Sequence, residues 1–249
     1  MAMCTRFAPS PTGRMHLGHA LAACFARDLA ATHAGGRMVL RFEDIDLTRV
    51  RPEFYDGIIE DLHWLGIAWD GEALRQTDRQ EAYQDAFEQL RAMDVVYPCF
   101  CTRKDIQAEW AAMGGAPQGQ DSIVYPAICQ RLDEAEQAEK LASGLPHAWR
   151  LDADKAAAML GSLDFEDLRF GRITVDPSML GHVVLMRKDI GVSYHLAVVV
   201  DDAFQQVTHV TRGEDLLPST HVHRMLQALL KLPAPVYHHH PLVLDEHGN

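Results

Sequence analysis

Alternating apolar and polar stretches at the start of the chain predict one strand–helix–strand unit. A short apolar run ends at Phe7, a segment with prolines and a glycine covers residues 9–13, and an alanine-rich stretch begins at His19. Proline disrupts helices and strands alike, so this order predicts a strand, a turn and a helix. Two glycines then end the helix, and residues 38–42 predict a second strand. Such a unit implies a parallel sheet with a binding crevice at the carboxyl ends of its strands.

The same α/β pattern continues on both sides of a middle segment of different character. Apolar residues recur at helical spacing over residues 52–66 and 79–93, which predicts two amphipathic helices. The pattern resumes with apolar runs from residue 182 onward. Residues 207–212 then predict a strand, and residues 219–230 predict a helix.

The middle segment has the features of an insertion. It contains a glycine- and glutamine-rich loop at residues 114–120 and an acidic helix at residues 133–141. Short β-like pieces lie near residues 148–151 and 172–175. We therefore predict three parts, with the two halves of one α/β domain flanking an insertion: residues 1–97, 98–188 and 189–249.

The composition is that of an ordinary globular protein. The chain has 249 residues, of which 47% are hydrophobic, enough for one large domain or for one domain that carries an insertion. No apolar run approaches the length that crosses a bilayer, and no leader-like segment opens the chain. The five cysteines are an odd number, which favours a reducing compartment over a disulfide framework. We expect a cytoplasmic monomer without membrane contact.

The net charge is acidic. Twenty-three Lys and Arg residues against 35 Asp and Glu residues give 23 − 35 = −12. Proteins that bind nucleic acid usually present a basic surface, so this balance counts against an RNA partner unless the arginines gather on one face.

The segment from His16 to His19 is the first candidate for chemistry. It falls on the turn and the first turn of the predicted helix, where free N–H groups and a partial positive charge suit a phosphate. Two imidazoles could both face that phosphate as donors, and Gly18 would let a base or sugar approach the backbone. The competing interpretation is a buried helix start with two hydrogen-bonded histidines.

Carboxylates follow the second predicted strand, beginning with Glu43. Glu43 therefore lies on the same rim of the sheet as the phosphate turn, which favours a functional role. Alternatively, residues 43–46 form an acidic loop that caps the next helix.

The insertion carries a candidate metal site. Its four potential ligands are Cys99, Cys101, Tyr125 and Cys129. Pro126 suits a first helical position, which would place Tyr125 and Cys129 on one face of a helix. Three thiolates and a phenolate could hold one structural Zn²⁺ tetrahedrally, and His147 or Asp133 could replace the tyrosine. The alternative is a set of free thiols around a packed tyrosine.

Several of these segments resemble one family of enzymes. The run from Pro9 to His19 resembles the nucleotide-binding signature of class I aminoacyl-tRNA synthetases. Residues 6–13 (RFAPSPTG) and 41–46 (RFEDID) are similar to its glutamyl subfamily. The C-x-C and Y-x₃-C pattern resembles one subgroup, the glutamyl-Q tRNA(Asp) synthetases. The resemblance covers nearly the whole chain, and it implies a Rossmann-type parallel-sheet nucleotide-binding domain interrupted by a zinc-containing insertion.

The resemblance also implies a site. Glutamate would be bound at Arg6, Ala8, Ser10, Glu43, Tyr194 and Arg212. Two arginines and one carboxylate suit the two carboxylates and the ammonium of glutamate, although an arginine can equally form a surface ion pair of little value. ATP, with Mg²⁺, would be contacted by His16, Gly18, His19 and Glu214. Of these, His16 and His19 would be the catalytic residues.

The implied reaction is the ATP-dependent activation of L-glutamate and its transfer to the queuosine base in the anticodon of tRNA(Asp). One departure matters, because the lysine-containing loop that clamps phosphates in this family should follow residue 249, where the sequence stops. Two alternatives therefore stay open. One is the catalytic fragment of a glutamyl-tRNA synthetase that charges tRNA(Glu), and the other is a catalytically silent zinc module that binds RNA.

Overall fold

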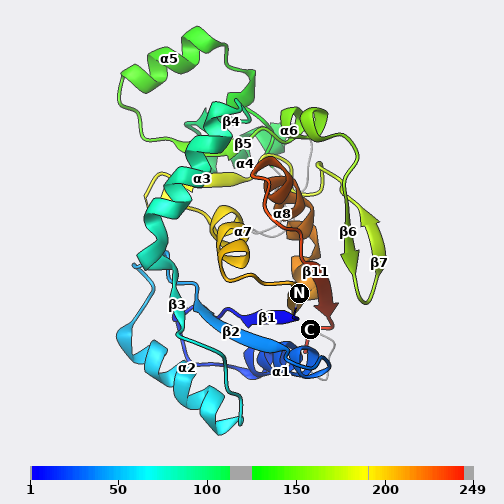
Figure 1. The fold of residues 1–249 in the computed structure, drawn as a ribbon. Coiled ribbons are helices and arrows are strands. Elements are labelled where there is room, and N and C mark those ends of the chain that lie inside the picture. Colours follow the sequence, from blue (N-terminus) through cyan, green and yellow to red (C-terminus); the bar gives the residue numbers. More distant parts are fainter. Residues whose placement is uncertain (1, 113–124, 190, 244–249) are drawn as a thin grey trace.

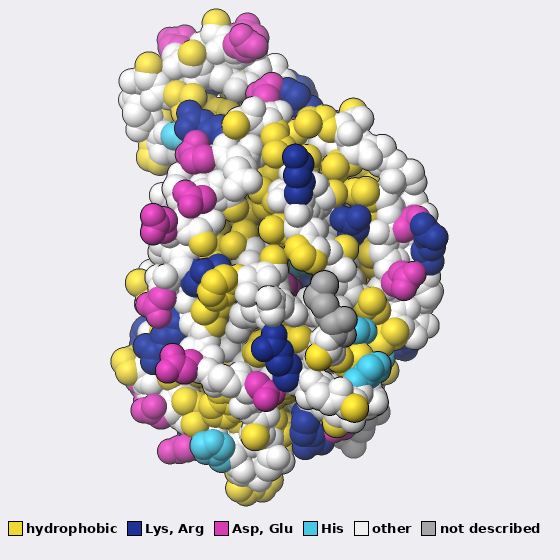
Figure 2. All heavy atoms as spheres, viewed as in Figure 1, with side chains coloured by type: hydrophobic (Ala, Val, Ile, Leu, Met, Phe, Trp, Pro, Cys, Tyr) yellow, Lys and Arg dark blue, Asp and Glu magenta, His cyan; other side chains and the backbone are white. Residues whose placement is uncertain are grey.

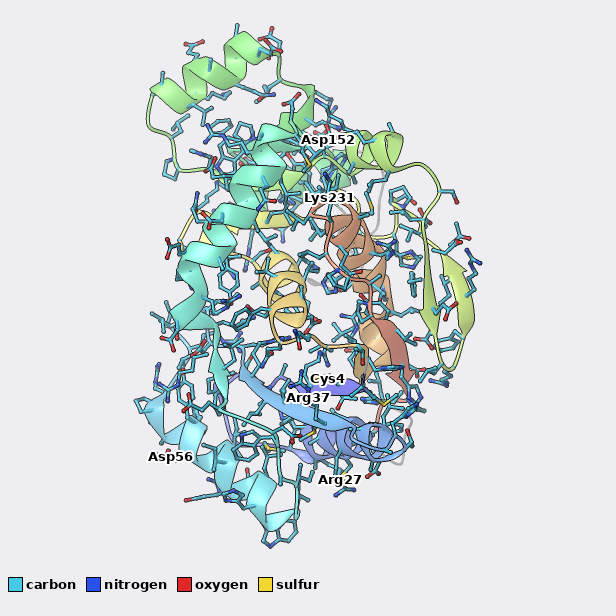
Figure 3. The ribbon with its side chains drawn as sticks, in the orientation of Figure 1. Cys4, Arg27, Arg37, Asp56, Asp152 and Lys231 are labelled. Atoms are coloured by element: carbon cyan, nitrogen blue, oxygen red, sulfur yellow. The ribbon has the colours of Figure 1, made fainter. Side chains whose placement is uncertain are left out.

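The N-terminal strand–helix–strand unit forms the first of two parallel ladders. The computed structural model of the protein describes residues 2–112, 125–189 and 191–243. Strand β1 (Cys4–Phe7) pairs in parallel with β2 (Arg37–Phe42), and β2 pairs in parallel with the short β3 (Leu74–Arg75). Figure 3 shows Cys4 and Arg37 side by side, where the β1–β2 register begins.

The second ladder combines strands from distant parts of the chain. Strand β10 (His209–Gly213) pairs in parallel with β11 (Val236–His240). Strand β11 pairs in parallel with β6 (Asp164–Asp167), which forms an antiparallel hairpin with β7 (Gly171–Thr174). Strand β6 thus comes from within residues 98–188, and the proposed boundaries of that segment stay a prediction.

The two ladders meet between β1 and β10. The Thr208 N–H donates to the Cys4 carbonyl at 2.9 Å, and a guanidinium nitrogen of Arg6 donates to the Thr211 carbonyl at 2.7 Å. The strand order therefore runs outward in both directions from this junction (Figure 1). A sheet whose strand order reverses opens a crevice at the carboxyl ends of the two central strands.

Helix α1 (Leu17–Ala31) crosses from β1 to β2, as the alanine-rich sequence predicts. Its buried residues are Ala23, Ala26 and Ala30, whose small side chains let the helix lie close to the sheet. Helix α2 (Pro52–Trp64) adds Ile58 and Leu62 to the same apolar core. The crossover is the predicted βαβ unit.

A second core lies beside the ladders, where three helices pack together. These are α3 (Gln80–Ala92), α7 (Tyr194–Phe204) and α8 (Leu217–Leu229). Helix α7 carries a buried carboxylate, Asp201, which accepts hydrogen bonds from the Tyr83 hydroxyl at 2.7 Å and the Gln76 amide at 2.9 Å. Gln76 lies on the single-turn helix η1 (Gln76–Arg79), so Asp201 ties α7 to both η1 and α3.

An antiparallel sheet covers the far side of this core. It has the order β4 (Val96–Cys99), β5 (Ala148–Leu151), β8 (Val184–Arg187) and β9 (Gly191–Val192). Both β-like pieces predicted from the sequence are confirmed, one as β5 and the other as β7. The apolar run from residue 182 supplies β8, while the following run forms helix α7.

Short helices complete the upper part of the molecule in Figure 1. They are α4 (Arg103–Ala112), η2 (Cys129–Arg131), α5 (Glu134–Ala142) and α6 (Ala153–Leu160). Helix α5 is the predicted acidic helix. The glycine- and glutamine-rich loop at 114–120 lies outside the described residues. None of the helices in the described ranges has the length and apolar character to cross a bilayer.

One local prediction is wrong. Pro126 does not begin a helix, because Ala127 has φ +54°, a left-handed conformation that an α-helix cannot contain. The helical turn starts only at Cys129, as η2. Tyr125 and Cys129 nevertheless meet, since the Cys129 N–H donates to the Tyr125 hydroxyl at 2.8 Å.

Charged side chains are mixed on the face drawn in Figure 2. There the Lys and Arg side chains lie scattered among acidic ones and do not gather into one basic patch. On this face, the arginines do not gather into the basic surface that an RNA partner would need.

Candidate active site

A pair of histidines caps the N-terminus of α1. Nδ1 of His16 accepts from the Gly18 N–H at 3.1 Å, and Nδ1 of His19 accepts from the His16 N–H at 3.4 Å. The two rings stack with centroids 3.8 Å apart. Because both Nδ1 atoms are acceptors, each neutral ring carries its proton on Nε2. Burial, followed by the neighbouring His16, lowers the pKa of His19, so this ring is a neutral N–H donor near pH 7.

Gly18 supports this cap rather than the cavity wall. A Cβ atom at this position would lie 3.1 Å from Cε1 of His16, so any larger residue would press on the capping ring. The sequence suggests that Gly18 lets a nucleotide approach the backbone, and that role stays a prediction.

Two buried arginines share one carboxylate on the opposite wall. The Arg6 Nε atom lies 3.3 Å from Oδ1 of Asp202, and a terminal nitrogen of Arg41 lies 2.8 Å from the same oxygen. Arg41 also reaches Glu43 at 3.4 Å. Burial raises the pKa of Glu43, against the lowering effect of Arg41 and Arg6. A cationic ligand group near Glu43 would stabilise its charged form.

The sequence reasoning missed Arg41 and Asp202. Both interrupt apolar runs, Arg41 within the strand at residues 38–42 and Asp202 at the end of the run that forms α7. A charge inside a buried run is rare unless it is paired, and this was the available signal.

Arg212 lies next to this network but has different neighbours. Its Nε donates to Nε2 of His239 at 3.1 Å, and one terminal nitrogen donates to the Tyr194 hydroxyl at 3.3 Å and to Nδ1 of His223 at 3.2 Å. The other terminal nitrogen donates to the Thr220 hydroxyl. Arg212 is only 5% exposed. No carboxylate in the described part of the chain forms an ion pair with it, so its charge is not compensated by direct contact.

The histidines around Arg212 are neutral. Burial, followed by the charge of Arg212, lowers the pKa of His195 to about 4. The same two causes lower the pKa of His239 to about 4, although Asp167 acts in the opposite direction. The pKa of His223 is likewise well below its ordinary value because the ring is buried beside Arg212. The guanidinium of Arg212 is therefore a cation whose histidine neighbours are neutral.

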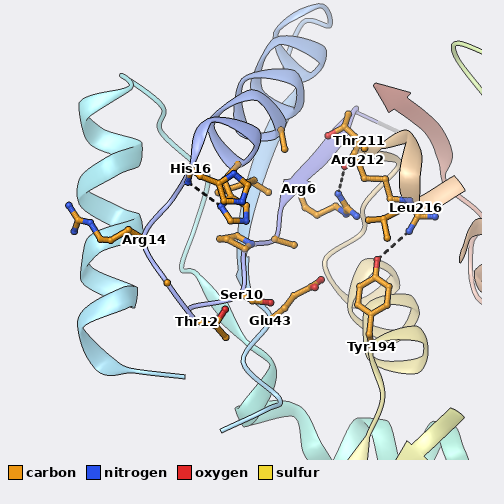
Figure 4. A pocket seen from close by; sticks show the side chains of 17 residues that line it. Arg6, Ser10, Thr12, Arg14, His16, Glu43, Tyr194, Thr211, Arg212 and Leu216 are labelled. Carbon is orange, nitrogen blue, oxygen red and sulfur yellow. Dashed lines mark hydrogen bonds between the residues drawn. The ribbon is translucent and has the colours of Figure 1, made fainter. Parts of the chain in front are cut away.

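These groups line one cavity of about 630 Å³, a volume typical of small-molecule sites. Figure 4 shows His16 on one wall, Arg6 and Arg212 on the other, and Ser10 and Glu43 between them. Eight residues predicted from the sequence line this cavity: Arg6, Ala8, Ser10, His16, His19, Glu43, Tyr194 and Arg212. Glu214, predicted to contact ATP, is not among the lining residues, and its carboxylate pairs with Arg169 at 2.5 Å. Its proposed role stays a prediction.

The cysteines at the start of the middle segment form a separate cluster. The Cys99, Cys101 and Cys129 sulfurs all lie within 4.8 Å of one another. The Tyr125 hydroxyl is 3.4 Å from both Cys99 and Cys101. These separations are close to those between ligands of a tetrahedral zinc ion, for which bond lengths of about 2.0–2.3 Å place neighbouring ligands roughly 3.5 Å apart. The four atoms therefore fit one closed metal site.

Each of the two alternative fourth ligands has a hydrogen-bond partner outside the cluster. The Asp133 carboxylate caps α5 by accepting from the Glu136 N–H at 2.8 Å. Nδ1 of His147 lies 3.0 Å from the Leu145 carbonyl. The hydrogen bond between Cys129 and Cys99 lowers the pKa of Cys99 and raises the pKa of Cys129, so this pair of thiols holds one thiolate, the form that binds a metal.

The fold and the cavity together define a class of protein. A parallel sheet with a switch point, a histidine-capped helix at its crevice and a charged pocket beside it are the features expected of a class I aminoacyl-tRNA synthetase catalytic domain. A family model described as tRNA synthetases class I (E and Q), catalytic domain, matches residues 2–249. The chain belongs to this family, and the prediction of a synthetase-like ligase is confirmed.

Individual relatives agree with the subgroup predicted from the sequence. A Glutamyl-Q tRNA(Asp) synthetase of Rhodobacter capsulatus is 49% identical over 99% of this chain and 89% of its own length. A Glutamate--tRNA ligase of Aquifex aeolicus is 38% identical over 97% of this chain but 49% of its own length. The crystal structure of Glutamate-tRNA Synthetase from Elizabethkingia anophelis superposes with a TM-score of 0.84 at 30% identity, covering 98% of this chain. The chain spans 51% of that structure, about half its length.

The neutral histidine shell predicts an acid-sensitive fold. Since the pKa of His239 is about 4 in the folded protein, the unfolded chain, with a pKa of about 6.5, takes up the proton first as the pH falls. Stability is therefore lost between about pH 6.5 and pH 4, and His239 accounts for roughly 2 kcal/mol of the loss between about pH 7.5 and pH 5. The free energy of unfolding in urea should therefore change by about 2 kcal/mol less between these two pH values in His239→Gln than in wild type.

The control is His33→Gln, which replaces an exposed histidine and should keep the contribution of His239 to the pH dependence. An equal pH dependence in wild type and His239→Gln would contradict the account of the buried imidazole.

Proposed function

We propose that this protein activates L-glutamate with ATP and transfers the glutamyl group to the queuosine base in the anticodon of tRNA(Asp). The observation that carries the proposal is the buried Arg212, a cation with neutral partners that faces the same cavity as Arg6 and Glu43. The identity and coverage of the Rhodobacter capsulatus relative support the choice of acceptor.

Glutamate suits the charges of this cavity. A substrate carboxylate would give Arg212 the ion pair that no carboxylate in the described part of the chain supplies, and bidentate geometry is the usual mode for a guanidinium. Arg6 is partly neutralised by Asp202 and offers a second cationic edge. The substrate ammonium would be held by Glu43, and the Tyr194 and Ser10 hydroxyls and the Ala8 backbone would orient the amino acid.

Activation needs positioning more than covalent catalysis. An oxygen of the α-carboxylate of glutamate attacks the α-phosphorus of ATP, the bond from that phosphorus to the bridging oxygen breaks, and pyrophosphate leaves with its Mg²⁺. The N–H groups at the start of α1 and the Nε2–H groups of His16 and His19 would stabilise the charge that develops on phosphate oxygens. In the second step, a hydroxyl of the queuosine base attacks the glutamyl carbonyl and AMP leaves.

We also propose that Cys99, Cys101, Tyr125 and Cys129 hold one structural Zn²⁺. The convergence of three sulfurs and a phenol oxygen supports this ligand set. Four protein ligands leave no coordination position for substrate, so the ion would stabilise the insertion and take no part in the reaction.

The main experiment compares two acceptors. Purified protein should catalyse glutamate-dependent exchange between ATP and pyrophosphate, and it should charge queuosine-containing tRNA(Asp) while leaving tRNA(Glu) uncharged. Unmodified tRNA(Asp), which lacks queuosine, is the matched control. Charging of tRNA(Glu) alone would favour the glutamyl-tRNA synthetase alternative, and absence of exchange would refute glutamate activation.

Arg212→Ala should greatly weaken glutamate binding and spare ATP binding. Loss of charge-assisted hydrogen bonds to one carboxylate costs about 3 kcal/mol, which corresponds to roughly a 100-fold weaker Kd by calorimetry. Arg172→Ala, which removes an arginine whose side chain is 73% exposed on β7, is the control and should bind both ligands normally. Unchanged glutamate affinity in the Arg212 variant would show that this residue does not bind the amino acid.

The metal site predicts one equivalent of zinc in purified protein. Cys101→Ser should lose the ion and melt at least about 6 °C lower, since each kcal/mol is worth about 2–4 °C in a chain of this size. Cys24→Ser, outside the cluster, should keep the zinc. If Tyr125→Phe retains zinc with unchanged affinity, the fourth ligand is not the phenolate.

A further inference from the structure

Behind Arg212 lies a second pair of residues that does not line the cavity. Oδ2 of Asp167 is 2.6 Å from Nδ1 of His239, and both side chains are fully buried. The opposite ring nitrogen of His239 accepts from Arg212. We propose that the Asp167–His239 pair positions Arg212 for the substrate carboxylate and preserves its charge for that carboxylate. This inference rests on the proposed function.

The three residues come from three neighbouring parallel strands. Arg212 on β10 is the register partner of His239 on β11, and Tyr237 on β11 is the register partner of Asp167 on β6. The order of side chains toward the cavity is therefore carboxylate, imidazole, guanidinium. Because the strands are hydrogen-bonded to one another, the alignment of these side chains depends on the register of the sheet.

Asp167 is itself held rigidly. Its Oδ1 accepts from the backbone N–H groups of Arg169 at 2.8 Å and Phe170 at 3.0 Å, in the turn after β6. Its Oδ2 accepts from the backbone N–H of His239 at 3.2 Å as well as from the ring. Although burial acts against the charged form, these hydrogen bonds lower the pKa of Asp167, so it is an anionic acceptor.

An anionic acceptor at Nδ1 determines the tautomer of His239. The ring proton lies on Nδ1, and Nε2 presents its lone pair to the Arg212 Nε–H at 3.1 Å. The Thr220 hydroxyl lies 3.1 Å from the same Nε2 and can also donate a hydrogen bond to it. In the other tautomer, an N–H would face the N–H of Arg212 and push the guanidinium away.

The imidazole also separates Asp167 from Arg212. Arg6 contacts Asp202 directly, and that contact neutralises part of its charge. Arg212 instead receives a neutral acceptor whose orientation is set by a carboxylate one ring further away. The arginine is thus oriented without a direct ion pair, and its attraction for an anionic substrate group is retained. With the side-chain carboxylate of glutamate at Arg212, the pair should favour glutamate over glutamine, whose side chain is neutral.

Two substitutions separate positioning of Arg212 from simple structural support. The amide of glutamine can place an acceptor near the Nε2 position of histidine, while the shorter asparagine reaches only the Nδ1 position. His239→Gln therefore keeps a hydrogen-bond acceptor for Arg212. His239→Asn keeps a hydrogen-bond donor to Asp167 but loses the acceptor for Arg212. His238→Asn, on the same strand but on its other face, is the matched control.

The measurement is the KM for glutamate and for ATP in pyrophosphate exchange, with glutamine as a competing substrate. For His239→Asn we expect at least a tenfold higher KM for glutamate, reduced discrimination against glutamine, and a KM for ATP within twofold of wild type. His239→Gln should restore the KM for glutamate to within about threefold of wild type. Equal effects of the two substitutions, or a parallel rise in both KM values, would overturn the proposal.

The tautomer itself can be measured in wild-type protein, which covers the case of a variant that fails to fold. Nitrogen-15 NMR of the imidazoles, assigned through His239→Gln or by selective labelling, should show His239 protonated on Nδ1 between about pH 6 and pH 8. A ring protonated on Nε2 would overturn the proposal. A wild-type protein without glutamate-dependent exchange would instead refute the proposed function, and the NMR result would still report on the Asp167–His239 pair.

Discussion

A buried guanidinium that has no carboxylate partner among the described residues is the feature on which the site depends. Burying an unpaired cation is unfavourable, and proteins usually place an acidic residue beside it. Here Arg212 is surrounded by a hydroxyl group from Tyr194, another from Thr220, and neutral imidazoles. These groups accept hydrogen bonds from its N–H groups but do not neutralise its positive charge. Arg6, which lines the same cavity, and the buried Arg41 both form direct ion pairs with Asp202, unlike Arg212.

The sheet explains how these charges reach one cavity. Arg6 and Arg212 lie near the carboxyl ends of β1 and β10, the two strands at the junction of the parallel ladders, and Glu43 follows β2. The histidine-capped end of α1 faces the same crevice, which places a donor-rich helix terminus opposite the arginines. Strand β6 contributes Asp167 from residues 98–188, so the middle segment supplies a residue behind the cavity as well as the cysteine cluster.

Much of the architecture could be predicted because its signals are local. The prolines before His16 indicate the turn, and the spacing of apolar residues indicates helices α2 and α3. The run that forms α7 was less informative, since consecutive valines suit a strand as well as a buried helix. Its helical state depends on packing against α3 and α8 and on the buried partners of Asp201. At Pro126, the preference of proline for a first helical position suggested a helix, but the left-handed backbone of Ala127 excludes one there.

The sequence by itself determined the kinds of residue at the site and the elements that carry them, because hydrophobic period, proline and glycine act over a few neighbouring residues. Only the tertiary structure decided which charges are paired. Arg6 and Asp202 are separated by 196 positions, and Asp167 and His239 by 72, so no local pattern links them. Strand order brought these side chains into contact, and burial then set the pKa of each imidazole. The difference between an arginine in an ion pair, such as Arg6, and Arg212, which has no carboxylate partner among the described residues, is a property of that packing.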